Sequence, residues 1–99
     1  MYYTYILRST KQKGAIYIGS TEDLKKRMAE HNSGAGASHT KKYLPWELET
    51  YIAFSKQEQA ENLERHLKSS SGKAFLRKRL ISLEFKTAMT KFNNGRGEK

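Results

Sequence analysis

We expect an α/β domain of the α+β kind from this sequence, with a small central three-stranded antiparallel sheet flanked by helices in the order β-β-α-β-α-α. Three observations predict it. The chain begins with two segments rich in β-branched and aromatic residues, separated by a turn sequence. Three later segments carry apolar residues at helical spacing, and an alternating segment lies between the first two of them. Finally, 99 residues suffice for one hydrophobic core and therefore one domain.

The first two strands are expected at residues 2–9 and 15–20, joined as a hairpin by the turn sequence TKQKG. In an antiparallel pair of strands, the numbers of any two facing residues have the same sum. When this sum is even, odd-numbered residues share one face of the sheet and even-numbered residues share the other. The isoleucines then form an apolar face that packs well. The opposite face carries Tyr5 and Tyr17, is more polar, and has a gap at Gly19.

The first helix is expected to begin with Ser20 or Thr21 as its N-cap, followed by acidic residues in the first turn, and to end at the sequence NSG. A basic, glycine-containing loop is expected at 33–46. The alternating segment 47–54 then predicts the third strand.

The second helix is expected at 55–70 with Ser55 as its N-cap, and a third helix follows after a break near Gly72. These elements form one domain over residues 1–83. Residues 84–99 are expected to form a C-terminal extension that is partly helical and then frayed.

The composition points to a polyanionic partner. Nineteen lysines and arginines against ten acidic residues give a net charge of +9, which favours nucleic acid before a membrane surface. No apolar run is long enough for a membrane span or a signal peptide, so we expect a cytoplasmic protein without a membrane partner. The lack of cysteine excludes disulfides and thiolate chemistry, and the three histidines lack the spacing of a zinc site.

Three polar residues fall on helix faces that should point inward. Arg27 and His31 lie four residues apart within the arc defined by Leu24 and Met28, so they project from one patch. On the second helix, Glu64 is the acidic residue at the edge of the apolar stripe. A charge close to the core must be paired, hydrogen-bonded or bound to a metal.

Two interpretations of these residues are open at this point. Arg27 and Glu64 can form a structural ion pair between two helices, with His31 as a partly exposed residue favourable to the helix dipole. Alternatively, the three residues can belong to a functional site. Spacing alone favours the structural interpretation, because structural ion pairs also occur in clefts.

The same segments resemble the GIY-YIG nuclease domain over residues 2–83. The resemblance rests on five ordered motifs: YTYIL, YIGST, DLKKRMAEHNSG, PWELETY and AENLERHLKSSSGKAFLRKRL. They are most similar to small stand-alone bacterial proteins resembling the N-terminal endonuclease domain of the excision-repair incision subunit, which implies a role in DNA repair. The first motif reads Tyr3-Thr4-Tyr5, so the glycine and isoleucine of the family name are absent whereas the functional tyrosine is present.

The resemblance implies hydrolysis of a DNA phosphodiester bond, as an endonuclease or nickase, with one divalent metal ion, Mg²⁺ or Mn²⁺. Carried over by position, it assigns a structural role at the site to Gly19, whose lack of a side chain leaves room for substrate. It also assigns five catalytic residues: Tyr5, Tyr17, Arg27, His31 and Glu64.

Phosphodiester hydrolysis gives each of these side chains a plausible task. Glu64 is the metal ligand, since Mg²⁺ takes one or two carboxylates and completes its shell with water and phosphate. Arg27 suits the non-bridging phosphate oxygens. The resemblance implies that Tyr17 orients or deprotonates the attacking water. Tyr5 is expected to hold Tyr17 or a phosphate, and His31 to relay a proton or contact phosphate.

Six further residues are expected to bind nucleic acid through charge and hydrogen bonding: His39, Lys41, Lys42, Lys73, Arg77 and Lys78. The first three belong to the basic loop, for which a simple solvated loop is an equal alternative. The expected partner is DNA, with branched and single-stranded forms both candidates. No feature of the sequence selects between a protein partner, a homo-oligomer and a monomer.

A second function from another class fits the same pattern. The chain can be a nucleic-acid-binding module that keeps the nuclease fold but has little or no turnover.

Overall fold

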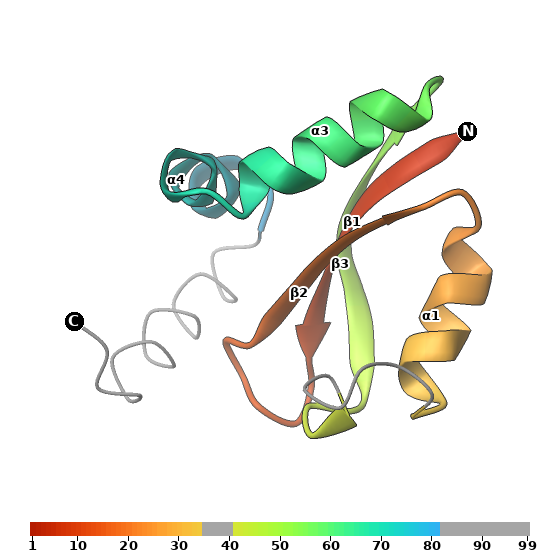
Figure 1. The fold of residues 1–99 in the computed structure, drawn as a ribbon. Coiled ribbons are helices and arrows are strands. Elements are labelled where there is room, and N and C mark those ends of the chain that lie inside the picture. Colours follow the sequence, from red (N-terminus) through yellow and green to blue (C-terminus); the bar gives the residue numbers. More distant parts are fainter. Residues whose placement is uncertain (35–40, 82–99) are drawn as a thin grey trace.

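The expected fold class and element order are confirmed. The computed structural model describes residues 1–34 and 41–81, so the expected extension at 84–99 lies outside the described residues. Its elements are β1 (Tyr2–Ser9), β2 (Ile16–Thr21), α1 (Leu24–Asn32), β3 (Trp46–Phe54), α3 (Gln57–Leu67) and α4 (Ser70–Arg79). The sheet lies between α1 on one side and α3 with α4 on the other (Figure 1). No helix of the described residues is long and apolar enough to cross a membrane.

The sheet has the order β2-β1-β3, and both pairings are antiparallel. In the β1–β2 pair, Tyr5 lies opposite Gly19 and Leu7 lies opposite Tyr17. The sum of facing residue numbers is therefore even, as predicted. Tyr5, Tyr17 and Gly19 consequently share one face of the hairpin.

Each face of the sheet supports a separate part of the core. On one face, Ile6 and Ile18 pack with Leu67 of α3 and Leu76 of α4. The other face holds a cluster of Tyr5, Leu7 and Trp46, against which Leu24 and Met28 of α1 and other half-buried hydrophobic side chains pack. The tyrosine face is thus covered by α1, the helix that carries Arg27 and His31.

The predicted helix caps were wrong. Ser20 and Thr21 pair with Thr4 and Tyr3 of β1, which extends β2 through both residues. Asp23 caps α1 instead, because its side chain accepts a hydrogen bond from the backbone N–H of Lys26. Ser20 and Thr21, which local preference assigns to the helix cap, are therefore part of the strand pairing instead.

The N-cap of the second helix is also one residue later than expected. Lys56, rather than Ser55, is the N-cap of α3, and its backbone N–H donates to the side chain of Gln59. This is half of a capping box, in which a side chain at the third helical position satisfies the N-cap amide.

The helix break expected near Gly72 lies a few residues earlier, between Leu67 and Ser70, and Gly72 itself is inside α4. The chain turns at Lys68 and Ser69, and the Ser69 hydroxyl accepts a hydrogen bond from the Gly72 amide. A Cβ atom at Gly72 would lie 1.6 Å from the carbonyl oxygen of His66. Gly72 is therefore required for the close approach of α3 and α4.

We expect Gly72→Ala to lower the free energy of unfolding by about 2 kcal/mol or more, because the new methyl group overlaps backbone that cannot move independently. Urea unfolding measures this change. Ser71→Ala, on the exposed side of the same turn, should have little effect. Equal stability of the two variants would show that the α3–α4 contact is looser than described.

Candidate functional site

Tyr5 lies across Gly19, and this contact organises the site. Tyr5 is completely buried in the middle of β1. A Cβ atom at position 19 would lie 2.6 Å from the Tyr5 Oη atom and 2.8 Å from its Cζ atom. The space above Gly19 is therefore filled by the phenol of Tyr5, which differs from the expectation that it would be left open for substrate.

The hydroxyl of Tyr5 shares a hydrogen bond with the imidazole ring of His31. The Tyr5 Oη and His31 Nε2 atoms are 3.0 Å apart, and the His31 ring centroid lies 4.7 Å from that of Tyr17. His31 is only 6% exposed. The alternative of a partly exposed histidine at the end of the helix was thus wrong. Within the described part of the chain, its buried Nδ1 atom has no hydrogen-bond partner.

Both members of this hydrogen bond are neutral at pH 7. Burial, reinforced by the charge of Arg27, lowers the pKa of His31 below 6.5. Burial and the neighbouring Tyr17 raise the pKa of Tyr5 to about 12. A neutral imidazole has one donor nitrogen and one acceptor nitrogen. If Nε2 accepts from the Tyr5 hydroxyl, Nδ1 carries the proton, and if Nε2 donates to it, Nδ1 is the acceptor.

Arg27 is half-buried and interacts with the Tyr5 hydroxyl. Its Nε atom pairs with the Glu30 carboxylate at 3.1 Å, one turn along α1. Partial burial alone would lower the pKa of Arg27, but the Tyr5 hydroxyl and Glu30 raise it, so the guanidinium stays charged. Arg27 pairs with Glu30 and Glu64 pairs with Lys68, so the alternative of a structural ion pair between Arg27 and Glu64 was wrong.

Glu64 is held by two residues that the sequence analysis missed. It accepts a hydrogen bond of 2.7 Å from the Ser20 hydroxyl and one of 2.8 Å from the Lys68 ammonium. Partial burial raises the pKa of Glu64, but these two partners outweigh it and hold the pKa below 4.5. The i,i+4 spacing was a signal for Lys68. Ser20 was hidden by its assignment as a helix cap.

Four of the five predicted catalytic residues meet at the hydroxyl of Tyr5. It shares a hydrogen bond with His31, the Tyr17 ring packs near both rings, and Arg27 acts on its ionisation. Glu64 is connected to this group through Ser20, which lines the same cleft as Arg27. A neutral, buried tyrosine–histidine pair thus lies beside a charged arginine and a charged glutamate. This arrangement can bind an anion at the arginine and a cation at the carboxylate.

A cleft of about 210 Å³ opens beside these charged groups. Eight residues from β1, β2, α1, α3 and the turn before α1 line it: Tyr2, Ser20, Thr21, Glu22, Arg27, Gln57, Ala60 and Glu61.

The donor set around Glu64 fits a weakly held Mg²⁺ or Mn²⁺ ion. Such ions prefer oxygen ligands, and the Glu64 carboxylate with the Ser20 hydroxyl supplies them. Among residues 1–34 and 41–81 there is no group of three or more acidic, histidine or cysteine side chains that could hold a metal. The remaining ligands would therefore be water and phosphate.

Of the loop residues predicted to bind nucleic acid, Lys41 and Lys42 are exposed, and His39 lies outside the described residues. The Lys42 ammonium lies 5.6 Å from the centroid of the Tyr43 ring. That ring packs edge-on against Trp46, whose centroid is 6.3 Å from that of Tyr17. A row of aromatic rings therefore connects the loop to the site.

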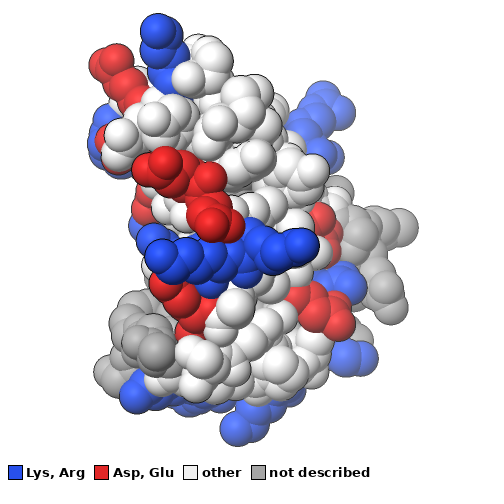
Figure 2. Space-filling model, turned by 90° about the vertical axis from the view of Figure 1, so that its right-hand side faces the viewer, with Lys and Arg blue, Asp and Glu red and all other residues white. Residues whose placement is uncertain are grey.

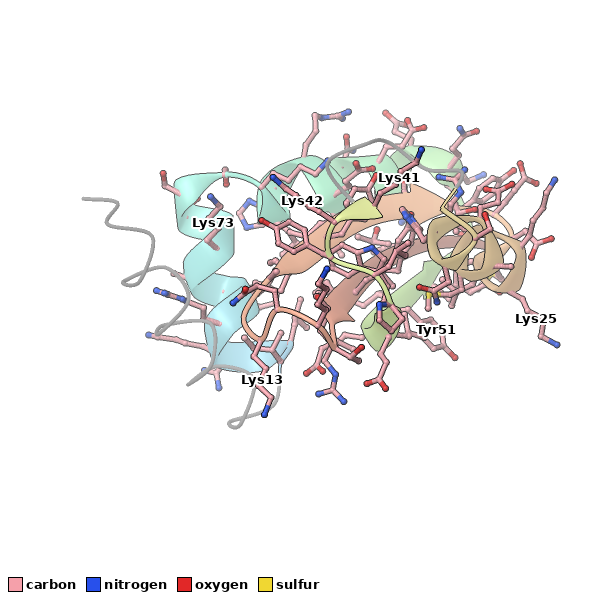
Figure 3. The ribbon with its side chains drawn as sticks, turned by 90° about the horizontal axis from the view of Figure 1, so that it is seen from below. Lys13, Lys25, Lys41, Lys42, Tyr51 and Lys73 are labelled. Carbon is pink, nitrogen blue, oxygen red and sulfur yellow. The ribbon has the colours of Figure 1, made fainter. Side chains whose placement is uncertain are left out.

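The predicted basic residues of α4 are Lys73, Arg77 and Lys78, and all three are exposed. Figure 3 shows Lys41, Lys42 and Lys73 on the same side of the molecule, whereas Lys13 and Tyr51 lie on the other side. On the face of the molecule that carries α1, a band of lysine and arginine side chains is bordered by acidic ones (Figure 2). The positive charge is therefore unevenly distributed.

Comparison with known proteins agrees with the resemblance noted in the sequence. Residues 1–79 match the model of the GIY-YIG catalytic domain. The UPF0213 protein YsiG of Lactococcus lactis subsp. lactis is 39% identical over 82 residues, which cover 83% of this chain and 73% of that protein. A UPF0213 protein of Lactococcus lactis subsp. cremoris is 41% identical over 63 residues, which cover 64% of this chain and 62% of that protein, less than two thirds of its length.

A solved structure has a similar fold. The solution NMR structure of the UPF0213 protein BH0048 from Bacillus halodurans has a TM-score of 0.50 and 32% sequence identity, with 88% of this chain and 94% of that chain covered.

Because His31 is buried and its pKa is lowered, we expect the free energy of unfolding to depend on pH. The unfolded chain, with an ordinary histidine pKa of 6.5, binds a proton that the folded chain resists. Stability should therefore fall as the pH is lowered from about 7.5 to about 5.5, by at most about 1.4 kcal/mol per pH unit. Urea unfolding at both pH values measures this loss.

His31→Gln should reduce the loss of stability between the two pH values, because glutamine does not titrate. His66→Gln, which changes an exposed histidine, should leave the loss as in the wild type. An equal loss in the wild type and His31→Gln would contradict a depressed histidine pKa.

Proposed function

This chain belongs to the GIY-YIG family, and on that premise we propose that it is an endonuclease or nickase that hydrolyses a DNA phosphodiester bond with one divalent metal ion, Mg²⁺ or Mn²⁺. The observation that carries the proposal is the Tyr5–His31 hydrogen bond with Tyr17 packed against it, beside a cleft lined by Arg27 and by Ser20, the hydrogen-bond partner of Glu64. A role in DNA repair and action on branched or single-stranded DNA are part of the same proposal.

Glu64 and Arg27 have different roles at the scissile phosphate. Glu64 is ionised at neutral pH and, with the Ser20 hydroxyl, would hold the divalent ion. When bound, the ion neutralises phosphoryl charge and stabilises the leaving oxygen. Arg27 binds the non-bridging oxygens, because its ion pair with Glu30 is half exposed and is readily exchanged for a phosphate.

The two tyrosines have different tasks. Tyr5 is fully buried and its pKa is raised to about 12, so it is unsuited to act as a base and instead positions its neighbours. Tyr17 is only half-buried and lies on the same face, so it is the tyrosine that orients the attacking water. His31 is too buried to contact a phosphate directly, and it holds or exchanges a proton with the Tyr5 hydroxyl.

Basic residues outside the site would draw the nucleic acid to it. Lys41, Lys42 and Lys73 lie on one side of the molecule and are exposed. Contacts of this kind release counterions, so binding should weaken steeply as salt is raised.

Cleavage of supercoiled plasmid and of labelled branched and single-stranded DNA tests the proposal, with Mg²⁺, Mn²⁺ or EDTA. Glu64→Gln should lower the cleavage rate by about 100-fold or more, because it removes the carboxylate charge at the metal. Glu58→Gln, on the exposed side of the same helix, should cleave like the wild type.

Equal cleavage by the wild type and Glu64→Gln would contradict the proposal and indicate a contaminating nuclease. DNA binding without cleavage in either metal would favour the alternative, a binding module with the nuclease fold and little or no turnover.

The ion pair between Lys68 and Glu64 should weaken metal binding at Glu64. The Lys68 ammonium occupies one oxygen of Glu64 and would compete with the ion, so Lys68→Met should strengthen Mn²⁺ binding by up to about fivefold, the range of an exposed ion pair. Electron paramagnetic resonance of free Mn²⁺ measures the affinity. Lys73→Met makes the same change in net charge away from Glu64 and should leave the affinity unchanged. Weaker binding by Lys68→Met would contradict the competition.

A further inference from the structure

The cleft next to Arg27 extends beyond the groups that the proposed hydrolysis uses. It shares Ser20 and Arg27 with the site. Three other lining residues, Tyr2, Gln57 and Glu61, have no task in the cleavage of a phosphodiester bond. They come from the start of β1 and the first turns of α3, whereas Arg27 comes from α1.

The chemistry of this lining suits a base better than a phosphate. Glu22 and Glu61 both line the cleft, and their carboxylates repel a phosphate while accepting hydrogen bonds from the amino groups of a base. Gln57 carries both donors and acceptors and already donates to the Glu61 carboxylate at 2.9 Å. Tyr2 adds a half-buried aromatic ring, of the type on which unpaired bases stack.

The size of the cleft limits its occupant. A volume of about 210 Å³ is smaller than the roughly 300–1,000 Å³ of pockets that hold drug-sized ligands. It therefore accommodates one small ring system and excludes a longer stretch of nucleic acid.

We propose that this cleft binds a single unstacked nucleobase of the DNA strand, adjacent to the phosphate held by Arg27. Arg27 belongs to the charged site and also lines the cleft. A phosphate bound by Arg27 would therefore lie next to the cleft, as a phosphate in DNA lies next to the base of its own nucleotide. Enzymes that act on nucleic acids obtain selectivity in this way, because an unpaired or mismatched base is the least costly to displace. The inference rests on the proposed function and specifies the substrate as DNA with an unpaired base at the cut.

A comparison of two short single strands of equal phosphate number tests the inference. One strand is oligodeoxycytidylate and the other has abasic tetrahydrofuran residues at every position, both labelled with fluorescein and titrated in EDTA at low salt. The wild type should bind the cytidylate at least about fivefold more tightly, the lower range of base stacking on an aromatic ring. Fluorescence anisotropy measures both affinities.

Two variants assign the base preference to the cleft. Gln57→Ala and Tyr2→Leu should each reduce the ratio of the two affinities toward one, while affinity for the abasic strand remains at the wild-type value. Tyr51→Leu is the matched control, because Tyr51 is an exposed aromatic residue that does not line the cleft. A wild-type ratio should persist in that variant.

Nuclear magnetic resonance supplies a second readout that does not depend on affinity. Contacts between base protons and the Tyr2 ring are expected, together with a shift of the Gln57 side-chain amide, which Gln57→Ala identifies. Equal binding of both strands by the wild type, or a ratio unchanged in both cleft variants, would overturn the inference and leave the proposed nuclease standing. Failure to bind either strand at low salt would instead overturn the nucleic-acid function itself.

Discussion

The contact of the Tyr5 ring with Gly19 is the constraint on which the rest of the site depends. The two residues lie opposite each other in neighbouring strands, and no side chain longer than hydrogen fits beneath the phenol. The ring therefore crosses β2 and places its hydroxyl at His31, deep under α1. Burial then raises the pKa of Tyr5 and lowers that of His31, so the centre of the site is neutral and its charges lie at the rim.

The charged rim depends on how the helices are attached to the sheet. Hydrogen bonds join α3 to both strands of the hairpin, from Thr4 to the carbonyl of Ala60 and from Ser20 to Glu64. These bonds place the carboxylate beside Ser20 at the end of β2, and Ser20 lines the same cleft as Arg27 of α1. A carboxylate and a guanidinium are thus held by different helices, which is the arrangement that the proposed hydrolysis of a phosphodiester bond requires.

The charge of this small, highly basic chain is unevenly distributed over its surface (Figure 2 and Figure 3). The positive residues Lys41, Lys42 and Lys73 share one side of the molecule, while acidic side chains border the basic band on the α1 face. Since like charges repel, the acidic residues would limit where the phosphate backbone of the proposed DNA substrate can lie. The cleft next to Arg27 carries two carboxylates, which is the basis of the proposal that it binds a base rather than the backbone.

Local periodicity by itself determined which residues share a face. Alternation placed Tyr5, Tyr17 and Gly19 together, and helical spacing placed Arg27 beside His31, because both patterns repeat over a few residues. Only the tertiary structure decided the partners. Glu64 lies 44 residues from Ser20, and no local rule predicts that contact. Strand pairing likewise overrode the preference of Ser20 for a helix cap, since its hydrogen-bonding partners come from a distant part of the chain.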